Sequence, residues 1–452
     1  MTLSGEVFIF ITFVDTWAGG ARIRYMDLGE AIRKDFPIYG RHRNAGAFVY
    51  LDSAATSLKP RVMIDAVKEY YEAYSTNVHR AAYSLAERAT EEYEGVRATV
   101  AKFIGASRAD EIIFTRNTTE SFNMLARTYA EHFIKEGEGI LLTEMEHHGN
   151  LIPWQELARR KSITLHFIPI DVATGVLVWN EQTFGAFLKE RNIKLISLTH
   201  ASNVLGTINP IAKISAIAHE AGVIIAVDGA QSTPHMPVNV QELGADFFAF
   251  SSHKMLGPTG IGILWGRYEL LEKMPVFMVG GHMIDDVMQT RATYRQPPLK
   301  FEAGTPNVAG TIGFGAAVKY LLELGMDHVR THEKMLLTAA RGRLAGIPGI
   351  SFLGPEDVED RSGVLAFTLA GVHPHDIGSL CNEAGVMIRV GDHCARPLHK
   401  KLGIPASCRA SFSVYNDIDD IDMLADVLKT VHQKLGTVSA SITHDTLPAG
   451  NH

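Results

Sequence analysis

Between about residues 60 and 270, short runs of apolar residues alternate with longer stretches that have helical periodicity. Five of the apolar runs predict β-strands, at 111–116, 139–144, 194–200, 223–228 and 246–251. The sequence VIIAV at the start of 223–228 is apolar throughout, which is typical of a strand buried on both faces. Strands that alternate with helices indicate βαβ units, so this region is predicted to form a mainly parallel sheet of the α/β class.

Polar residues follow each predicted strand at the point where it ends. In chain order they include Thr118 and Thr119, His147, Asn203, Asp228, and His253 with Lys254. The carboxyl ends of parallel strands meet at one edge of an open sheet, and ligands bind there. The pattern therefore predicts a ligand site built from these residues.

After Pro306 the pattern changes and predicts a smaller α+β domain. Helical periodicity covers 312–324, 327–344, 374–384 and 418–435, and strand-like runs cover 363–371, 386–391 and 408–415. We therefore expect five segments: an N-terminal extension at 1–25, a segment at 26–60 that packs with the small domain, a large domain at 61–306, the small C-terminal domain at 307–437, and a flexible tail at 438–452.

Composition and charge exclude several classes of protein. Hydrophobic residues make up 46% of the 452 residues and charged residues 21%, as in a folded globular protein. The net charge of −7 argues against a nucleic-acid partner, because binding phosphates needs a basic surface. Three cysteines, none in C-x-x-C spacing, indicate a reducing compartment without disulfides or a structural zinc site, and the cytoplasm is the expected location.

The first 25 residues contain the apolar run VFIFITFV at 7–14. This run is too short to span a membrane as a helix, and no basic region precedes it as in a signal peptide. The segment MDLGEAIRKDF then opens at Met26. We interpret 1–25 as an upstream extension without a catalytic role; a native chain that begins before Met26 would contradict this interpretation.

Lys254 is the first candidate for chemistry. It leaves a predicted buried strand in the sequence SSHK and precedes a glycine-rich turn at 257–260. Desolvation in such a place lowers the pKa of a lysine and favours Schiff-base formation. An exposed loop lysine is the alternative. Asp228, 26 residues upstream, could face a pyridinium nitrogen or cap a turn. Gln231 could bind a phenolic oxygen of the same ring.

Two further features could hold a phosphorylated aromatic ligand. Thr118 and Thr119 open a helix, where hydroxyls and backbone N–H groups bind phosphate, although ordinary N-capping explains them equally well. His147 could lie flat over an aromatic ring or could be a partly buried loop histidine.

The sequence RVGDHCARP at 389–397 places Cys394 beside a histidine and two arginines. Nearby positive charge favours the thiolate, which is the nucleophilic form of cysteine. Cys381 and Cys408 lie in a predicted amphipathic helix and a predicted strand, so they are expected to be buried and inert. Arg409 could clamp a carboxylate or pack on a helix, and Asn203 could bind the same carboxylate or a cofactor oxygen.

Eleven motifs in this order resemble one family. They are YLDSAATS (50–57), NVHR (77–80), TTES (118–121), MEHHGN (145–150), THASNVLGT (199–207), VDGAQS (227–232), SSHKMLGPTGIG (251–262), GGHMI (280–284), FEAGTPN (301–307), RVGDHCARP (389–397) and CRASFSVYN (408–416). The chain, from about residue 26 to 435, resembles the Suf-type cysteine desulfurases, which depend on pyridoxal 5'-phosphate (PLP) and belong to the class-V aminotransferase group of fold type I.

The resemblance implies how PLP would be bound. Lys254 would form the Schiff base and move protons, Asp228 would pair with the pyridine nitrogen, Gln231 would contact the phenolic oxygen, and His147 would stack on the ring. The remaining cofactor contacts implied by the resemblance come from Thr118, Thr119, Asn203, Ser251, His253 and, from the partner subunit of a homodimer, the position of Thr305.

The resemblance also implies the reaction. Asn203 and Arg409 would hold the carboxylate of L-cysteine, with Arg389 and His79 also on the substrate side. Cys394 would attack the substrate sulfur, form a persulfide and leave L-alanine. The short cysteine loop resembles the group that passes sulfur to a small acceptor protein of the SufE or SufU kind, for iron–sulfur cluster or other sulfur-cofactor synthesis.

Three residues depart from the family pattern. Asp392 replaces the first histidine of R-x-G-H-H-C, and a carboxylate there would raise the pKa of Cys394 and slow its attack. Asn117 and Ser252 stand where glycine is usual. These differences concern the rate and the acceptor more than the type of reaction.

Other functions stay open at this point. A selenocysteine lyase or another class-V aminotransferase or lyase would share the scaffold. A non-catalytic binding scaffold is disfavoured, because it would not need Lys254, Asp228 and Cys394 together. A dinucleotide-dependent dehydrogenase is disfavoured because no G-x-G-x-x-G follows an early strand.

Overall fold

The computed structural model describes residues 28–42, 46–79 and 82–436. The predicted extension at 1–25 and the predicted tail at 438–452 lie outside the described residues. Within the described ranges, no helix has both the length and the apolar character to cross a bilayer.

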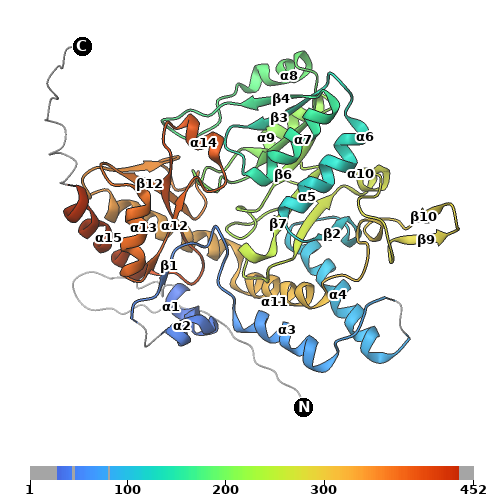
Figure 1. The fold of residues 1–452 in the computed structure, drawn as a ribbon, viewed down its shortest axis with the longest axis horizontal. Helices are drawn as coiled ribbons and strands as arrows, with labels where there is room; N and C mark the ends of the chain where they lie inside the picture. The colour runs from blue at the N-terminus through green and yellow to red at the C-terminus, as the bar shows by residue number, and fades with distance from the viewer. Residues whose placement is uncertain (1–27, 43–45, 80–81, 437–452) are drawn as a thin grey trace, which may run out of the picture.

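A seven-stranded sheet forms the centre of the larger part of the molecule (Figure 1), in the order β2-β8-β7-β6-β5-β3-β4. Its strands are β2 (Ile112–Thr115), β3 (Gly139–Thr143), β4 (Thr164–Ile168), β5 (Ile193–Thr199), β6 (Ile224–Asp228), β7 (Phe247–Ser251) and β8 (Gly262–Gly266). Strand β8 is antiparallel to both neighbours, and the other six run in one direction. The predicted α/β fold with a mainly parallel sheet is confirmed.

The five predicted strands are confirmed as β2, β3, β5, β6 and β7. Strands β4 and β8 were not predicted. Strand β8 follows a glycine-rich turn and itself begins with Gly262, so its pattern looks like a continuation of the turn. Glycine is required there by packing, because a Cβ at Gly262 would lie 2.5 Å from the backbone of Asn117.

Helices cover both faces of this sheet. Successive side chains of a strand point to opposite faces, so each buried strand contributes to two cores. On β6, Ile225 and Val227 pack into one core while Ala226 packs into the other. The first core includes residues of α4 (Ser84–Phe103), α8 (Glu181–Glu190), α9 (Ile211–Glu220) and α11 (Val308–Leu324). The second includes residues of α5 (Thr118–Leu125), α7 (Ile152–Lys161) and α10 (Tyr268–Lys273).

A second, antiparallel sheet lies to the left of the first in Figure 1, in the order β11-β12-β15-β14. Its strands are β11 (Ile350–Leu353), β12 (Val364–Leu369), β14 (Arg389–Gly391) and β15 (Ser407–Ser411). Helices α12 (Met326–Leu344), α13 (Pro374–Glu383) and α15 (Ile418–Val431) share its core, and α14 (Arg396–Lys401) follows β14.

Two segments pack between or alongside the regions built on the seven-stranded and the four-stranded sheets. Helix α11, which the sequence analysis assigned to the smaller domain, packs against α3 (Arg61–Ala73) and α4 on the large-sheet side, because it is apolar around most of its surface. Near the N-terminus, α1 (Leu28–Ile32) and α2 (Pro37–His42) precede β1 (Val49–Tyr50), which pairs with β13 (Val386–Met387).

The remaining described elements are short. Helix α6 (Glu131–Phe133) precedes β3, and a hairpin of β9 (Ile284–Val287) and β10 (Ala292–Tyr294) extends to the right in Figure 1.

Candidate active site

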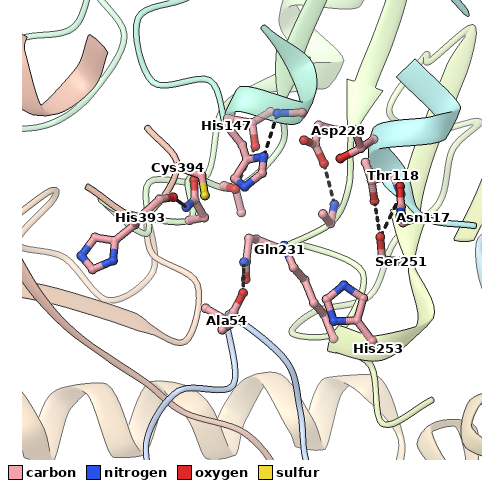
Figure 2. A pocket seen from close by; sticks show the side chains of 18 of the residues that line it. Ala54, Asn117, Thr118, His147, Asp228, Gln231, Ser251, His253, His393 and Cys394 are labelled. Carbon is pink, nitrogen blue, oxygen red and sulfur yellow. Dashed lines mark hydrogen bonds between the residues drawn. The ribbon is translucent and has the colours of Figure 1, made fainter. Parts of the chain in front are cut away.

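A cavity of about 240 Å³ lies at the carboxyl ends of the parallel strands, facing the cysteine loop and the small sheet (Figure 2). Most of the residues singled out in the sequence line it together. They are Thr118, Thr119, His147, Asn203, Asp228, Gln231, Ser251, His253, Lys254, Arg389, Cys394 and Arg409. The sheet brings these residues together because β2, β3, β5, β6 and β7 all end at this edge.

Lys254 follows β7 in a single turn of 3₁₀ helix, Ser252–Lys254. Burial lowers the pKa of Lys254 to about 8, and the carboxylate of Asp228 opposes this shift. About one-tenth of Lys254 is therefore an uncharged amine at pH 7, far more than for a lysine with the ordinary pKa, and the uncharged amine is the nucleophilic form.

The peptide bond that precedes Lys254 is held by a segment that the sequence analysis did not single out for a role. The carbonyl of His253 accepts hydrogen bonds from the backbone N of Ser57 (2.9 Å), the hydroxyls of Thr56 (3.0 Å) and Ser57 (3.1 Å), and Nζ of Lys59 (2.8 Å). Burial lowers the pKa of Lys59 to about 7. The only sequence signal for this contact was the neighbouring motif YLDSAATS, which carries no chemistry by itself.

Asp228 and Gln231 follow β6 and are both buried. One oxygen of Asp228 accepts from the backbone N of Ala230 (2.9 Å), and burial raises the pKa of Asp228, against the effects of that hydrogen bond and of Lys254. Gln231 donates from Nε2 to the carbonyl of Ala54 (2.8 Å), and its buried Oε1 has no partner among the described residues. Such an unpaired amide oxygen fits a site that receives a polar ligand.

The start of α5 lines one end of the cavity. Thr118 donates from its backbone N to Oγ of Ser251 (2.9 Å), and the two hydroxyls lie 2.6 Å apart. Asn117 caps the helix by accepting from the backbone N of Glu120 (2.9 Å). Its φ of −176° is an extended conformation, so the residue has no need to be glycine. The positive dipole end of α5 favours an anion.

His147 forms one wall of the cavity after β3. Its Nδ1 accepts a hydrogen bond from the backbone N of Gly149 (2.9 Å). Burial lowers the pKa of His147 to about 3, and the positive charge of Lys254 adds to the shift. The ring is therefore neutral at pH 7 and carries its proton on Nε2. A neutral, fixed imidazole suits packing against an aromatic ring.

Glu146, the residue before His147, has a buried carboxyl that was not predicted from the sequence. Its buried carboxyl accepts from the hydroxyl of Thr143 (2.6 Å), the amide of Asn150 (2.6 Å) and the backbone N of Thr199 (3.1 Å). Burial raises the pKa of Glu146 to about 8.

Cys394 lies in the loop between β14 and α14, half-buried, on the side of the cavity occupied by His147 (Figure 2). The ring of the preceding residue, His393, points away from the cavity. The other two cysteines are fully buried as expected, and burial raises the pKa of Cys381 to about 12. Among the described residues, Cys394 is thus the cysteine that a substrate can reach.

A cluster of charges closes the side of the cavity next to Cys394. Arg409 on β15 is buried, donates to the carbonyl of Asn203 (2.9 Å) and to Asp52 (3.1 Å), and has a buried Nε without a partner among the described residues. Arg389 lies 3.6 Å from the same Asp52 carboxylate. Two guanidinium groups share one carboxylate, so this corner can accept a second carboxylate. The sequence analysis missed Asp52.

His79 and Thr305 do not line this cavity. Nε2 of His79 lies 2.8 Å from Glu94, and its ring packs against His282. Thr305 is exposed. A role at the site stays a prediction for both residues.

These features together fit PLP. The site offers a lysine amine with a lowered pKa, a buried carboxylate for a pyridine nitrogen, a helix N-terminus for a phosphate, and a neutral imidazole wall. The unpaired oxygen of Gln231 adds a polar contact within the same cavity.

Comparison with known proteins points to a family of PLP-dependent enzymes. The model of the family described as aminotransferase class-V matches residues 49–424. A relative named "Probable cysteine desulfurase" from Streptomyces coelicolor is 46% identical over 418 residues, covering 90% of this chain and 98% of the relative.

Two solved structures share the fold over most of both chains. The apo structure of a cysteine desulfurase from Thermococcus onnurineus NA1 is 38% identical with a TM-score of 0.85, covering 90% of this chain and 98% of that one. The cysteine desulfurase CsdA from Escherichia coli is 38% identical with a TM-score of 0.82, covering 90% and 99%. The chain therefore belongs to the class-V aminotransferase family, within its cysteine desulfurases.

Proposed function

We propose that this protein is a PLP-dependent cysteine desulfurase that converts L-cysteine to L-alanine and retains the sulfur on Cys394 as a persulfide. The observation that supports this most directly is one cavity lined by a desolvated lysine, Lys254, and an accessible cysteine, Cys394. Lysine chemistry on an amino acid needs only the first group. A thiol in the same cavity is what sulfur transfer requires in addition.

Bound PLP supplies an electron sink at the substrate α-carbon. Lys254 removes the α-proton and returns protons to carbon, while Asp228 holds the pyridine nitrogen. The thiolate of Cys394 attacks the substrate sulfur, and an S–S bond forms as the C–S bond breaks. The electron pair of the C–S bond stays with carbon, which takes up a proton to give the methyl group of alanine.

The remaining residues bind and orient. Arg409 and the amide of Asn203 receive the substrate carboxylate, with Arg389 on the same side. Thr118, Thr119, Ser251 and His253 hold the phosphate, Gln231 contacts the phenolic oxygen, and the neutral ring of His147 packs on the cofactor. His79 lies on the substrate side of the assembled enzyme.

Two partners belong to the proposal. A homodimer would bring Thr305 of one chain to the cavity of the other, which agrees with its exposure here. Several large apolar side chains of the segment 278–294 are also exposed: Met278, Val279, Val287, Met288 and Tyr294. The backbone N of Gly304 donates to the carbonyl of Gly281 in this segment (2.9 Å). A small SufE- or SufU-like protein would collect the sulfur, because the cysteine loop is short. Three unpaired cysteines suit a cytoplasmic location.

L-Cysteine turnover by the PLP-loaded protein tests the proposal. We expect alanine and enzyme-bound persulfide in equal amounts in a single turnover, and continued turnover when a thiol reductant removes the sulfur. Selenocysteine is measured in parallel, because a lyase specific for it would share the scaffold. Turnover of selenocysteine or another amino acid, with none of L-cysteine, would overturn the assignment and leave the cofactor site intact.

The lowered pKa of Lys254 predicts how PLP capture by the apo-protein depends on pH. The uncharged amine reacts, so with a pKa of about 8 the initial rate should rise about tenfold from pH 7 to pH 9 and then level off. Asp228 stabilises the charged ammonium, so Asp228→Asn should move the rise to lower pH. Stopped-flow absorbance of PLP checks both. A rise centred near 10.5, the ordinary pKa of lysine, would show that Lys254 is not desolvated.

A further inference from the structure

The loop that carries Cys394 has an unusual backbone. His393 and Cys394 both have positive φ angles, 50° and 57°, and they follow Gly391 at 124°. Residues with a Cβ seldom adopt two consecutive left-handed conformations, because the Cβ approaches the following carbonyl. Such a loop keeps its shape only where surrounding groups hold it.

Contacts from within the loop and from the large-sheet side hold it. Within the loop, the backbone N of Cys394 donates to Oδ1 of Asp392 (3.1 Å), so the residue that departs from the family pattern caps the cysteine. From the end of β5, the amide of Asn203 donates to the carbonyl of His393 (2.7 Å).

His148 makes two contacts with the loop, one at Cys394 and one just after it. Its backbone N donates to the carbonyl of Cys394 (2.8 Å), and its ring Nε2 accepts from the backbone N of Arg396 (3.2 Å), the first residue of α14. His148 thus holds the carbonyl of Cys394 itself and the backbone N–H of the residue two positions later. His148 does not line the cavity, so it does not touch the reacting groups.

The two contacts of His148 with the loop, here called the clamp, lie next to the wall of the cavity. His147 forms the cavity wall on the Cys394 side (Figure 2), and its own ring is fixed by Gly149. His147, which forms the wall, and His148, which forms the clamp, are therefore adjacent residues at the start of one turn of 3₁₀ helix, His148–Asn150. The backbone of Cys394 is thus hydrogen-bonded to the residue next to the cavity wall.

We propose that His148 is a positioning residue for the sulfur-transfer step, acting through Cys394. The inference rests on the proposed function. Substrate binding and the reactions at the α-carbon depend on Lys254 and Arg409, which His148 does not contact. Loss of the ring contact should therefore slow attack on the substrate sulfur and leave the earlier steps unchanged, because a displaced nucleophile reacts more slowly.

The test compares His148→Leu, which removes the ring acceptor, with His148→Gln, whose amide oxygen can replace Nε2. The backbone N–H stays in both. The matched control is His328→Leu, at an exposed histidine of α12. In single turnovers of the PLP-loaded enzyme, we expect the cofactor absorbance change on adding L-cysteine to keep its rate in all three. Persulfide formation should fall roughly ten- to a hundredfold in His148→Leu and recover in His148→Gln.

A second readout needs no cofactor. Iodoacetamide should modify Cys394 several-fold faster in apo His148→Leu than in wild type or His148→Gln, because the released loop exposes the thiol. Peptide mapping identifies the modified cysteine. If His148→Leu does not load with PLP, His148→Asn replaces it, since the shorter amide stops short of Arg396.

The outcomes separate this inference from the proposed function. Persulfide formation at the wild-type rate in His148→Leu, or an equal loss in the absorbance change and the persulfide step, would overturn the positioning role. If wild type itself forms no persulfide from L-cysteine, the proposed function fails; the alkylation rates then still decide whether His148 holds the loop.

Discussion

Lys254→Ala is expected to lose covalent PLP and to reduce L-cysteine turnover by at least ~10³-fold, because one side chain supplies both the nucleophilic amine and the proton-transferring group. Two observations support this double role. The pKa of Lys254 is lowered by burial to about 8, and four hydrogen bonds fix the carbonyl that precedes it. Cofactor absorbance after dialysis and an alanine assay measure the two losses separately.

The matched control for this variant is Lys334→Ala, which removes a lysine that pairs with Glu359 on the outside of α12. It should keep cofactor and activity. Borohydride reduction of the loaded wild type, followed by peptide mapping, should mark Lys254. A labelled lysine elsewhere, or a Lys254→Ala protein that retains its cofactor colour and turnover, would refute the assignment.

Cys394→Ser is expected to retain PLP and to bind L-cysteine. It should form no enzyme-bound persulfide, and its rate of alanine formation should be lower by roughly 10²–10⁴-fold. Serine preserves the size of the side chain and the loop contacts through the backbone, but an alkoxide is not available at neutral pH to take up sulfur. The cofactor absorbance change on adding L-cysteine should persist, because the thiol takes no part in the reactions at the α-carbon.

Cys381→Ala serves as the matched control, because that thiol is fully buried in α13 and burial raises its pKa to about 12. It should form persulfide at the wild-type rate. Mass spectrometry of wild type after one turnover should place the additional sulfur on the peptide that contains Cys394. Persulfide on Cys381 or Cys408, or full desulfuration by Cys394→Ser, would mean that Cys394 is not the acceptor.

Local pattern was enough to predict much of the site, because the chemistry is attached to strand ends. Val223–Val227 is apolar throughout, so a buried strand was predicted, and Asp228 had to lie at its end. The same reasoning placed His147, Asn203 and Lys254 at one edge of the sheet. Roles such as the phosphate contact of Thr119 or the partner position of Thr305 came from family resemblance, since spacing does not show what a side chain faces.

The sequence alone therefore determined the α/β class, the mainly parallel direction of the large sheet and most of the candidate residues that line the cavity, because hydrophobic periodicity and polar residues at strand ends are local properties. Only the tertiary structure decided the contacts between distant segments. These include β8 against Asn117, α11 on the large-sheet side, Lys59 on the carbonyl of His253, and Asp52 between Arg389 and Arg409. The clamp of His148 on the Cys394 loop belongs with them, because it joins residues about 250 positions apart in the chain. Each depends on how separate elements pack, and packing partners far apart in the chain leave no local pattern.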